Sequence, residues 1–196
     1  MKPILVIYAT REGQTRHIAE HLAAKLSAQQ RSCDLVDAAH TPEEFSLTKY
    51  SAAIVSASLH GGKHEMEMVK FVKRHLEELR EIPAMFLSVS LSEVTAEDTK
   101  ASPEKRAEAQ ADVNRTIESF LAETGWYPLH IAAVGGALMY SKYNFVIRFV
   151  MKRIAKKAGA PVDTTRDYEF TDWTKLDLLV DEFVASTSTD INVGKC

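Results

Sequence analysis

The chain has 196 residues, the size of one large domain, and 45% of them are hydrophobic. This composition supports a buried core and excludes fibrous and disordered chains. The 24 basic and 27 acidic residues give a net charge of −3, so the whole molecule has no bulk attraction for nucleic acid. We therefore predict that nucleic acid is not a partner.

The cysteine content and the apolar runs indicate the compartment. Cys33 and Cys196 form neither a CxxC motif nor a disulfide framework, which favours a reducing environment. The apolar run that begins at Ile4 breaks at residues 10–12, too early for a secretory signal. No stretch of 18 apolar residues is present to span a bilayer. We expect a cytoplasmic protein, and peripheral membrane attachment stays open.

Short β-branched apolar runs alternate with stretches of helical period along the chain. The predicted strands cover residues 4–8, 33–36, 52–57, 84–89 and 129–134, and the helical patterns cover about 15–26, 68–79, 103–123 and 173–184. Ser102 and Asp172 are the expected N-caps of the last two helices, and Gly125 is the expected C-cap of the first of these two. This alternation predicts an α/β fold with a doubly wound, five-stranded parallel sheet.

Two segments stand outside this alternation. Residues 138–171 separate the fifth strand from the last helix, where a connection of a few residues would be sufficient. We interpret them as an insertion in a single domain of residues 1–185. Residues 186–196 lack an apolar period, so we expect a loose, disordered tail.

The opening strand leads directly into Thr10-Arg11-Glu12-Gly13-Gln14-Thr15, and a helix begins at about Thr15. Ligands of open parallel sheets bind beyond the carboxyl ends of the strands, where this loop lies. Backbone N–H groups at a helix N-terminus, together with the hydroxyls of Thr10 and Thr15, can surround a phosphate. GxGxxG and GxxxxGK[ST] are both absent, which disfavours a dinucleotide and an NTPase and leaves a monophosphate. The alternative is that the threonines and Gly13 only cap the helix.

Two more loops are expected at the same edge of the sheet. The third strand leads into residues 58–64, where Gly61 and Gly62 allow a planar ligand to approach the backbone. The fourth strand leads into residues 88–92. Three loops that converge on one crevice suit a ligand with a phosphate arm and a flat ring.

These residues carry a family resemblance. The segment from Thr10 to Thr15 resembles the phosphate loop of flavodoxins, which bind FMN. From Met1 to about Ser186 the chain is similar to the flavodoxin-like, menaquinone-dependent protoporphyrinogen IX dehydrogenases of bacterial haem biosynthesis, in the strings YATREGQTRHIAEHL, ASLHGGKH, GGALMYSKYNFVIRFVMKRIAKKAG and DTTRDYEFTDW. The last two strings are distinctive, because ordinary flavodoxins lack the long stretch with a basic helix. The resemblance implies a flavodoxin-like sheet with an inserted basic helix before the last helix.

The resemblance also implies a site and a reaction. FMN would be the cofactor, protoporphyrinogen IX the substrate and protoporphyrin IX the product, with electrons passed to menaquinone or ubiquinone at the cytoplasmic face of the inner membrane. The implied contacts with the FMN phosphate are Thr10, Arg11, Gly13, Gln14 and Thr15, and Glu12 is a further implied cofactor contact. The implied contacts beside the ring are Ser58, Leu59, His60, Gly61, Ser90, Leu91 and Ser92. Flavodoxins often stack Trp and Tyr on the ring, whereas these loops offer Leu59, His60 and Leu91.

Alternative functions remain open on the residues alone. They are a flavodoxin-fold quinone reductase with another substrate, an electron-transfer flavodoxin with a protein partner, and a module without a cofactor that attaches to membranes. No catalytic acid or base is assigned, and no oligomeric state is predicted.

Residues 140–160 carry six basic and no acidic side chains, which leaves −9 on the rest of the chain. Apolar residues from Phe145 to Ile154 form a broad face, and basic residues lie along another. A basic amphipathic helix of this kind lies on an anionic membrane surface or docks a partner. The alternative is a crossover helix packed on the domain with solvated lysines. The candidate contacts with substrate propionates or membrane are Arg148, Lys152, Arg153, Lys156 and Lys157.

Other chemistry has little support in the sequence. His17 and His21 lie four residues apart, but HExxH does not occur, so we predict no metal site. His60 is a candidate for proton handling, and the alternative is a loop histidine bonded to backbone. Trp126 and Trp173 are expected to be packing residues.

Overall fold

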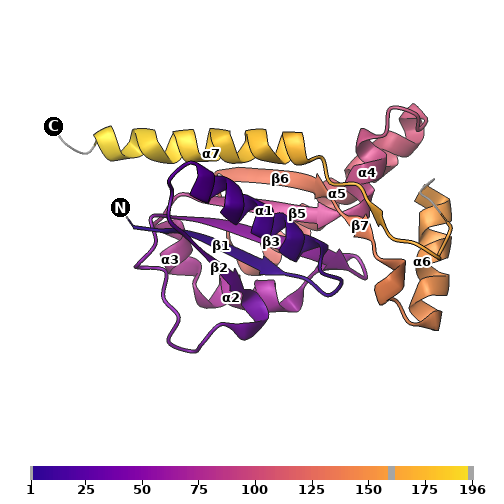
Figure 1. Ribbon diagram of the computed structural model, residues 1–196, viewed down its shortest axis with the longest axis horizontal. Helices are drawn as coiled ribbons and strands as arrows, with labels where there is room; N and C mark the ends of the chain where they lie inside the picture. Colours follow the sequence, from indigo (N-terminus) through magenta and orange to yellow (C-terminus); the bar gives the residue numbers. More distant parts are fainter. Residues whose placement is uncertain (1, 159–161, 194–196) are drawn as a thin grey trace.

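Parallel strands form the centre of the computed structural model, which describes residues 2–158 and 162–193 (Figure 1). The strands β1 (Ile4–Ala9), β2 (Cys33–Asp37), β3 (Ala52–His60), β5 (Ala84–Ser90) and β6 (His130–Gly135) are hydrogen-bonded in the order β2-β1-β3-β5-β6. All four pairings between them are parallel. A short strand, β4 (Lys63–His64), pairs antiparallel with β3. The predicted parallel sheet of five strands is confirmed, with β4 added at one end of β3.

Helices cover both faces of this sheet. One face carries α1 (Gln14–Ala28) and α7 (Trp173–Val193), and the other carries α2 (Met66–Arg74), α3 (Leu76–Arg80) and α5 (Pro103–Thr124) (Figure 1). Successive strand residues point to opposite faces, so Val6 packs in the core with α1 and α7, whereas Ile7 packs in the core on the other face. The doubly wound arrangement follows from these two separate cores.

The predicted helix ends are confirmed. Ser102 accepts a hydrogen bond from the Lys105 N–H at 3.4 Å at the start of α5, and Gly125 ends the helix in the left-handed region, with φ of 70°. Asp172 accepts a bond from the Lys175 N–H at 2.9 Å at the start of α7. Trp126 is 2% exposed, as expected of a packing residue.

Two stretches that were predicted as loops are regular structure. β3 continues to His60, and the chain turns through Gly61 and Gly62, with φ of 60° and 80°, into β4. Two consecutive residues with positive φ are what a tight hairpin turn requires. α4 (Leu91–Glu97) begins directly after β5, and Ser90 caps it by accepting a bond from the Glu93 N–H at 3.2 Å.

The helix predicted for residues 68–79 is divided at His75. The backbone of His75 leaves the helical region, and its Nδ1 lies 2.9 Å from Glu78 Oε1. The imidazole is buried and packs against Phe71 and Phe45, with ring centroids 4.6 and 5.7 Å away. Burial of this ring accounts for the break between α2 and α3. A short 3-10 turn, η1 (Ala38–His40), follows β2.

The expectation of a loose tail from residue 186 is wrong, because α7 continues to Val193. The Ser186 hydroxyl donates to the Phe183 carbonyl at 2.7 Å, and the Thr187 hydroxyl donates to the Val184 carbonyl at 2.9 Å. These local bonds satisfy the hydroxyls within the helix, so an apolar period is not needed for it to continue. Residues 194–196 of the expected tail lie outside the described residues.

The predicted insertion has its own small structure. It contains β7 (Ala137–Leu138), the 3-10 turn η2 (Tyr140–Lys142), α6 (Phe145–Ala158) and β8 (Tyr168–Glu169). β7 and β8 pair antiparallel, so the two ends of the insertion are joined. A separate cluster, which includes Leu138, Tyr140 and Ala155, packs beneath α6. Figure 1 places α6 beyond the strand ends that carry the arrowheads.

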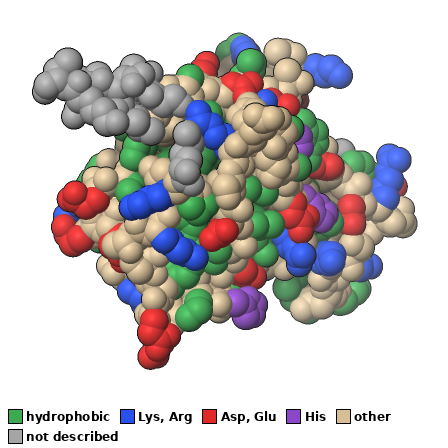
Figure 2. Space-filling model, turned by 60° about the vertical axis from the view of Figure 1, so that its left-hand side comes forward, with side chains coloured by type: hydrophobic (Ala, Val, Ile, Leu, Met, Phe, Trp, Pro, Cys, Tyr) green, Lys and Arg blue, Asp and Glu red, His purple; other side chains and the backbone are tan. Residues whose placement is uncertain are grey.

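Surface charge is mixed on the face drawn in Figure 2, where acidic and basic side chains alternate with small apolar areas. No field of a single sign extends over that face. Across residues 2–158 and 162–193, no helix combines the length and the apolar character needed to cross a bilayer.

Candidate functional site

A cavity of about 610 Å³ opens at the carboxyl ends of β1, β3 and β5. This volume lies in the usual range for small-molecule sites. Its walls come from the β1–α1 loop, the β3–β4 hairpin, the β5–α4 junction, α5 and the insertion. The three predicted loops therefore meet, and two further elements join them.

One end of the cavity has the properties of an anion site. Thr15 is fully buried, and its Oγ1 has no hydrogen-bond partner among the residues that the structure describes. The first N–H groups of a helix lack intrahelical partners, and the first turn of α1 contains no acid. Gly13, with φ of 101°, has open space where a Cβ would project. A buried hydroxyl without a partner costs about 1–3 kcal/mol, so the Thr15 hydroxyl and these N–H groups fit a bound phosphate.

The other residues of the predicted phosphate loop have separate roles. Thr10 Oγ1 accepts a bond from the Gly13 N–H at 3.0 Å and holds the turn. Gln14 lines the cavity and donates to Glu169 Oε1 at 2.7 Å and Thr171 Oγ1 at 2.9 Å, so it connects the loop to the end of the insertion.

The family resemblance predicts that Arg11 contacts the FMN phosphate, but Arg11 does not line the cavity. Its Nε lies 2.9 Å from Glu65 Oε2, and 54% of its side chain is exposed. Because Glu65 is buried, it holds the guanidinium against the base of the β3–β4 hairpin. The structure thus brings Thr10, Gln14 and Thr15 to the cavity, and it turns Arg11 away.

The residues predicted beside the ring all line the cavity. They are Ser58, Leu59, His60, Gly61, Ser90, Leu91 and Ser92. A Cβ at Gly61 would meet no atom within 4 Å. The Ser90 carbonyl accepts a bond from the Gly136 N–H at 2.9 Å, which joins the β5–α4 junction to the strand that leads into the insertion. These residues fit a flat ring because Gly61 leaves space above the backbone and Leu59 and Leu91 supply apolar side chains.

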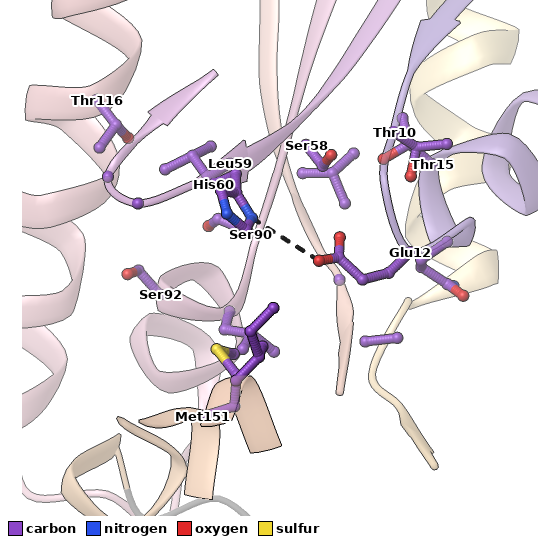
Figure 3. A pocket seen from close by; sticks show the side chains of 18 of the residues that line it. Thr10, Glu12, Thr15, Ser58, Leu59, His60, Ser90, Ser92, Thr116 and Met151 are labelled. Atoms are coloured by element: carbon purple, nitrogen blue, oxygen red, sulfur yellow. Dashed lines mark ion pairs between the residues drawn. The ribbon is translucent and has the colours of Figure 1, made fainter. Parts of the chain in front are cut away.

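Glu12 and His60 face each other across the cavity (Figure 3). Glu12 Oε1 lies 3.8 Å from His60 Nδ1, and the two side chains are 24% and 40% exposed. Glu12 is one of the predicted cofactor contacts, and its carboxylate points toward the β3–β4 hairpin. This orientation separates the negative charge of Glu12 from the anion site.

The insertion supplies cavity walls that sequence reasoning did not assign to the site. Tyr143, Val146, Ile147, Val150 and Met151 line one side. Their spacing of three and four residues, continuous from Tyr143 into α6, is the signal that places them on one face. Burial, and secondly the charge of Glu12, raises the pKa of Tyr143 to about 12.

A second missed group comes from α5. Asp112, Arg115 and Thr116 line the cavity opposite the insertion, and Arg115 is paired with Asp112. Only the packing of α5 beside the strand ends brings them to the site.

The basic residues of α6 do not act alike. Lys152 and Arg153 are exposed. Arg148 is half-buried, and its Nη2 donates to the Tyr143 carbonyl at 3.2 Å. It therefore does not share the exposed position that the helical period predicts for the basic residues of α6. Lys156 and Lys157 lie in α6, but their side chains are outside the described part of the structure.

The alternative in which the apolar face of α6 packs on the domain is wrong for most of that face. Phe145 is 86% exposed, Val146 67% and Phe149 59%. Met151 and Ala155 make the contacts with the small core of the insertion instead. α6 therefore presents apolar side chains to the exterior beside exposed cations.

The two histidines considered as metal ligands, His17 and His21, have different surroundings. His21 Nε2 lies 2.8 Å from Asp177 Oδ1, and its ring packs on Trp173 at 4.7 Å. His17 is exposed on α1. Within residues 2–158 and 162–193, no group of three or more His, Cys, Asp or Glu side chains is arranged to hold a metal ion.

Comparisons with known proteins agree with this geometry. Residues 5–165 match the flavodoxin domain model. The protoporphyrinogen IX dehydrogenase [quinone] of Escherichia coli K12 is 33% identical over 169 residues, which are 86% of this chain and 87% of that protein. The protein of the same name in Leishmania major is 29% identical over 92% of this chain and 74% of its own length.

Solved structures show the same fold at low identity. Oxidised flavodoxin 1 from Bacillus cereus superposes with a TM-score of 0.51 at 16% identity, covering 93% of this chain and 97% of its own. A short-chain flavodoxin associated with a bacterial microcompartment gives 0.57 at 14% identity, covering 95% and 99%.

Proposed function

The chain belongs to the flavodoxin family, and on this premise we propose that it uses FMN to oxidise protoporphyrinogen IX and passes the electrons to a quinone. The observation that carries the proposal is the buried, unpartnered Thr15 hydroxyl at one end of a cavity whose far wall is the apolar side of α6. A simple electron carrier needs only the first of these two features. The second provides space for an organic substrate beside the cofactor.

The residues at the strand ends fit FMN. Thr15, Gly13 and the first turn of α1 would hold the phosphate, while the β3–β4 hairpin and the β5–α4 junction would hold the ring. When bound, FMN supplies hydride and electron transfer. The protein contributes orientation and, through the insertion, exclusion of water.

The outer part of the cavity complements a flat, apolar molecule that carries carboxylates. Val146, Ile147 and Val150 form an apolar wall, and Arg115 lies on the opposite side. Protoporphyrinogen IX combines a large apolar macrocycle with two propionates, which Arg115 and the exposed Lys152 could pair with. Conversion to protoporphyrin IX removes six electrons and six hydrogens, so three quinones become three quinols per substrate.

We place the enzyme peripherally on an anionic membrane surface, at the cytoplasmic face of the inner membrane. Phe145, Val146 and Phe149 project outward next to exposed Lys152 and Arg153. Each cation near an anionic surface contributes about 1 kcal/mol, and inserted apolar side chains add to this. Because Val146 also lines the cavity, a quinone in the lipid would reach the site without crossing water.

Anaerobic turnover tests the reaction. Purified protein reconstituted with FMN should convert protoporphyrinogen IX to protoporphyrin IX, detected by porphyrin fluorescence, only when menaquinone or ubiquinone analogues are present. Reduction of quinone without porphyrinogen oxidation would indicate a quinone reductase with another substrate. Reduction of a protein acceptor alone would indicate an electron-transfer flavodoxin, and absence of bound FMN would remove all three functions.

Vesicle binding tests the location. Replacement of Lys152, Arg153, Lys156 and Lys157 by Gln should weaken sedimentation with anionic phospholipid vesicles, most strongly at low salt. The matched control replaces the exposed Lys70 and Arg74 of α2 by Gln. Equal losses in both variants would contradict a membrane role for α6.

A further inference from the structure

From the geometry of the cavity we infer that Glu12 and His60 form a proton-accepting pair for the reaction, an assignment that rests on the proposed function. His60 would take up the proton that accompanies each pair of electrons leaving the substrate, and Glu12 would stabilise the imidazolium. The pair would then release this proton to the quinone.

The position of the pair suits this role. Glu12 Oε1 and His60 Nδ1 are 3.8 Å apart, and both side chains project into the cavity from different loops (Figure 3). Glu12 directly precedes the anion site in sequence, and His60 ends the strand whose hairpin flanks the proposed ring site. A general base must lie within reach of the proton that it receives, and this pair borders the region between the anion site and α6.

The other titratable groups that line the cavity are not available to accept this proton. Among the described residues that line it, these are Tyr143, Asp112 and Arg115. Tyr143, with its pKa raised to about 12 mainly by burial, keeps its proton at neutral pH. Asp112 is paired with Arg115 on α5, and an arginine does not act as a base.

Other cations belong to the elements that surround the pair. Arg11, next to Glu12 in the chain, is paired with the buried Glu65. Lys63 is the cross-strand partner of His60 in the hairpin and is exposed. Arg148 donates to the Tyr143 carbonyl on the insertion side. Glu12 is the acidic side chain that the structure places opposite His60.

The proton balance requires such a group. The whole conversion removes six hydrogens from the tetrapyrrole, four from carbon and two from nitrogen. Each two-electron step takes one hydrogen from carbon as a hydride, a transfer that FMN would supply when bound. Each step also releases a second hydrogen, from nitrogen or carbon, as a proton, and this proton needs a base. When the quinone is reduced it gains two electrons and two protons, so the proton held by the pair leaves with the quinol and the pair returns to its starting state.

The test measures proton uptake in the FMN-loaded full chain without substrate or quinone. The midpoint potential for two-electron reduction is recorded between pH 5.5 and 9, because its slope with pH gives the protons bound per electron pair. The variants are His60→Gln and Glu12→Gln. The control is His17→Gln, which changes an exposed histidine outside the cavity.

The flavin itself contributes a change from two protons per electron pair to one as the pH rises, in every variant. We expect wild type and His17→Gln to bind, over part of the pH range, up to one proton more per electron pair than His60→Gln, whose uptake should be that of the flavin alone. Glu12→Gln should move this extra uptake to lower pH, because an amide stabilises an imidazolium less than a carboxylate does.

A dependence of midpoint potential on pH in His60→Gln that is the same as in His17→Gln would overturn the assignment. The proposed function can fail separately. If proton uptake is as expected but protoporphyrinogen IX is not oxidised anaerobically, the substrate assignment is wrong and the assignment of the Glu12–His60 pair stands. A chain that binds no FMN would overturn both.

Discussion

The two walls of the cavity differ in how they are supported. The inner wall, formed by the β1–α1 loop and the β3–β4 hairpin, continues from neighbouring central strands of the sheet and contains the fully buried Thr15. The outer wall, formed by α6, rests on a small cluster of its own and exposes Phe149 at 59%. Rigid elements hold fixed groups accurately, whereas sparsely packed elements open at low cost in free energy.

This difference matches the two kinds of ligand that we propose. A cofactor that stays bound needs fixed donors, which the inner wall provides. A substrate and a quinone that exchange at each turnover need access, which a laterally attached helix provides. The following experiments act on one wall while leaving the other intact, in order of decreasing expected effect.

The largest effect is expected at His64, which supports the inner wall from within the core. Its Nε2 lies 2.9 Å from Ser88 Oγ, and its ring makes edge contacts with the stacked rings of Phe86 and Phe120. Burial lowers the pKa of His64 to about 4 from the usual value near 6.5. Between pH 6.5 and 4 the imidazole of His64 is therefore protonated in the unfolded chain and neutral in the folded chain. The stability that is present above pH 6.5 is lost as the pH falls toward 4.

The loss should amount to about 3 kcal/mol in the free energy of unfolding, measured by urea denaturation from pH 7 to pH 4. His64→Gln keeps a polar partner for Ser88 and does not titrate, so its stability should vary less with pH. His17→Gln, on the exposed side of α1, should retain the full loss. Identical pH profiles for His64→Gln and wild type would show that this site is not responsible.

The second effect is expected at Thr15 and concerns the cofactor. Thr15→Val keeps the shape of the side chain and removes a hydroxyl that has no partner within the described protein. Loss of one bond to a charged phosphate costs about 2 kcal/mol, so FMN affinity should fall about thirtyfold in a fluorescence titration. Thermal stability without FMN should not fall.

Ser56→Ala is the matched control, because Ser56 also has a buried hydroxyl without a partner but does not line the cavity. FMN affinity should be unchanged in this variant. A similar loss of affinity in both variants would mean that the Thr15 effect is indirect.

The inner wall could be predicted from the sequence because local signals specify it. The apolar run from Ile4, the loop from Thr10 to Thr15 and the cap at Ser102 each act over a few residues. The Ser90-x-x-Glu93 pattern was equally local, and it would have indicated α4 had it been treated as an N-cap.

The outer wall could be predicted only in part. The period of α6 revealed an apolar face, but a period does not say whether that face meets the core or the exterior. Arg115 reached the cavity through the packing of α5, which links residues distant in sequence. Arg148 turned inward because the Tyr143 carbonyl lay within reach of its guanidinium.

The third effect is expected at Phe149 and concerns only the outer wall. Phe149→Ser removes an exposed ring of α6, so folding should change by less than about 0.5 kcal/mol. Loss of its insertion into lipid should weaken binding to anionic vesicles about tenfold. Leu129→Ser is the matched control, because Leu129 is 91% exposed and precedes β6 at the opposite end of the sheet. Comparable losses in both variants would contradict selective docking through α6.

The smallest effect is expected at the connection between the two walls. Gln14 belongs to the inner wall, and its side-chain amide donates to Glu169 and Thr171 at the end of the insertion. Gln14→Leu removes both bonds, each with a net contribution of about 1 kcal/mol or less. Global stability should therefore change little, while amides of β7 and β8 should exchange with solvent several-fold faster by hydrogen–deuterium exchange.

Gln29→Leu provides the control for this connection, since Gln29 bonds Asp181 on the exposed surface between α1 and α7. Its effect on exchange in β7 and β8 should be nil. Unchanged exchange in Gln14→Leu would mean that the pairing of β7 with β8 holds the outer wall by itself. Faster exchange would mean that the phosphate loop restrains the insertion, so that cofactor binding at one wall also limits the opening of the other.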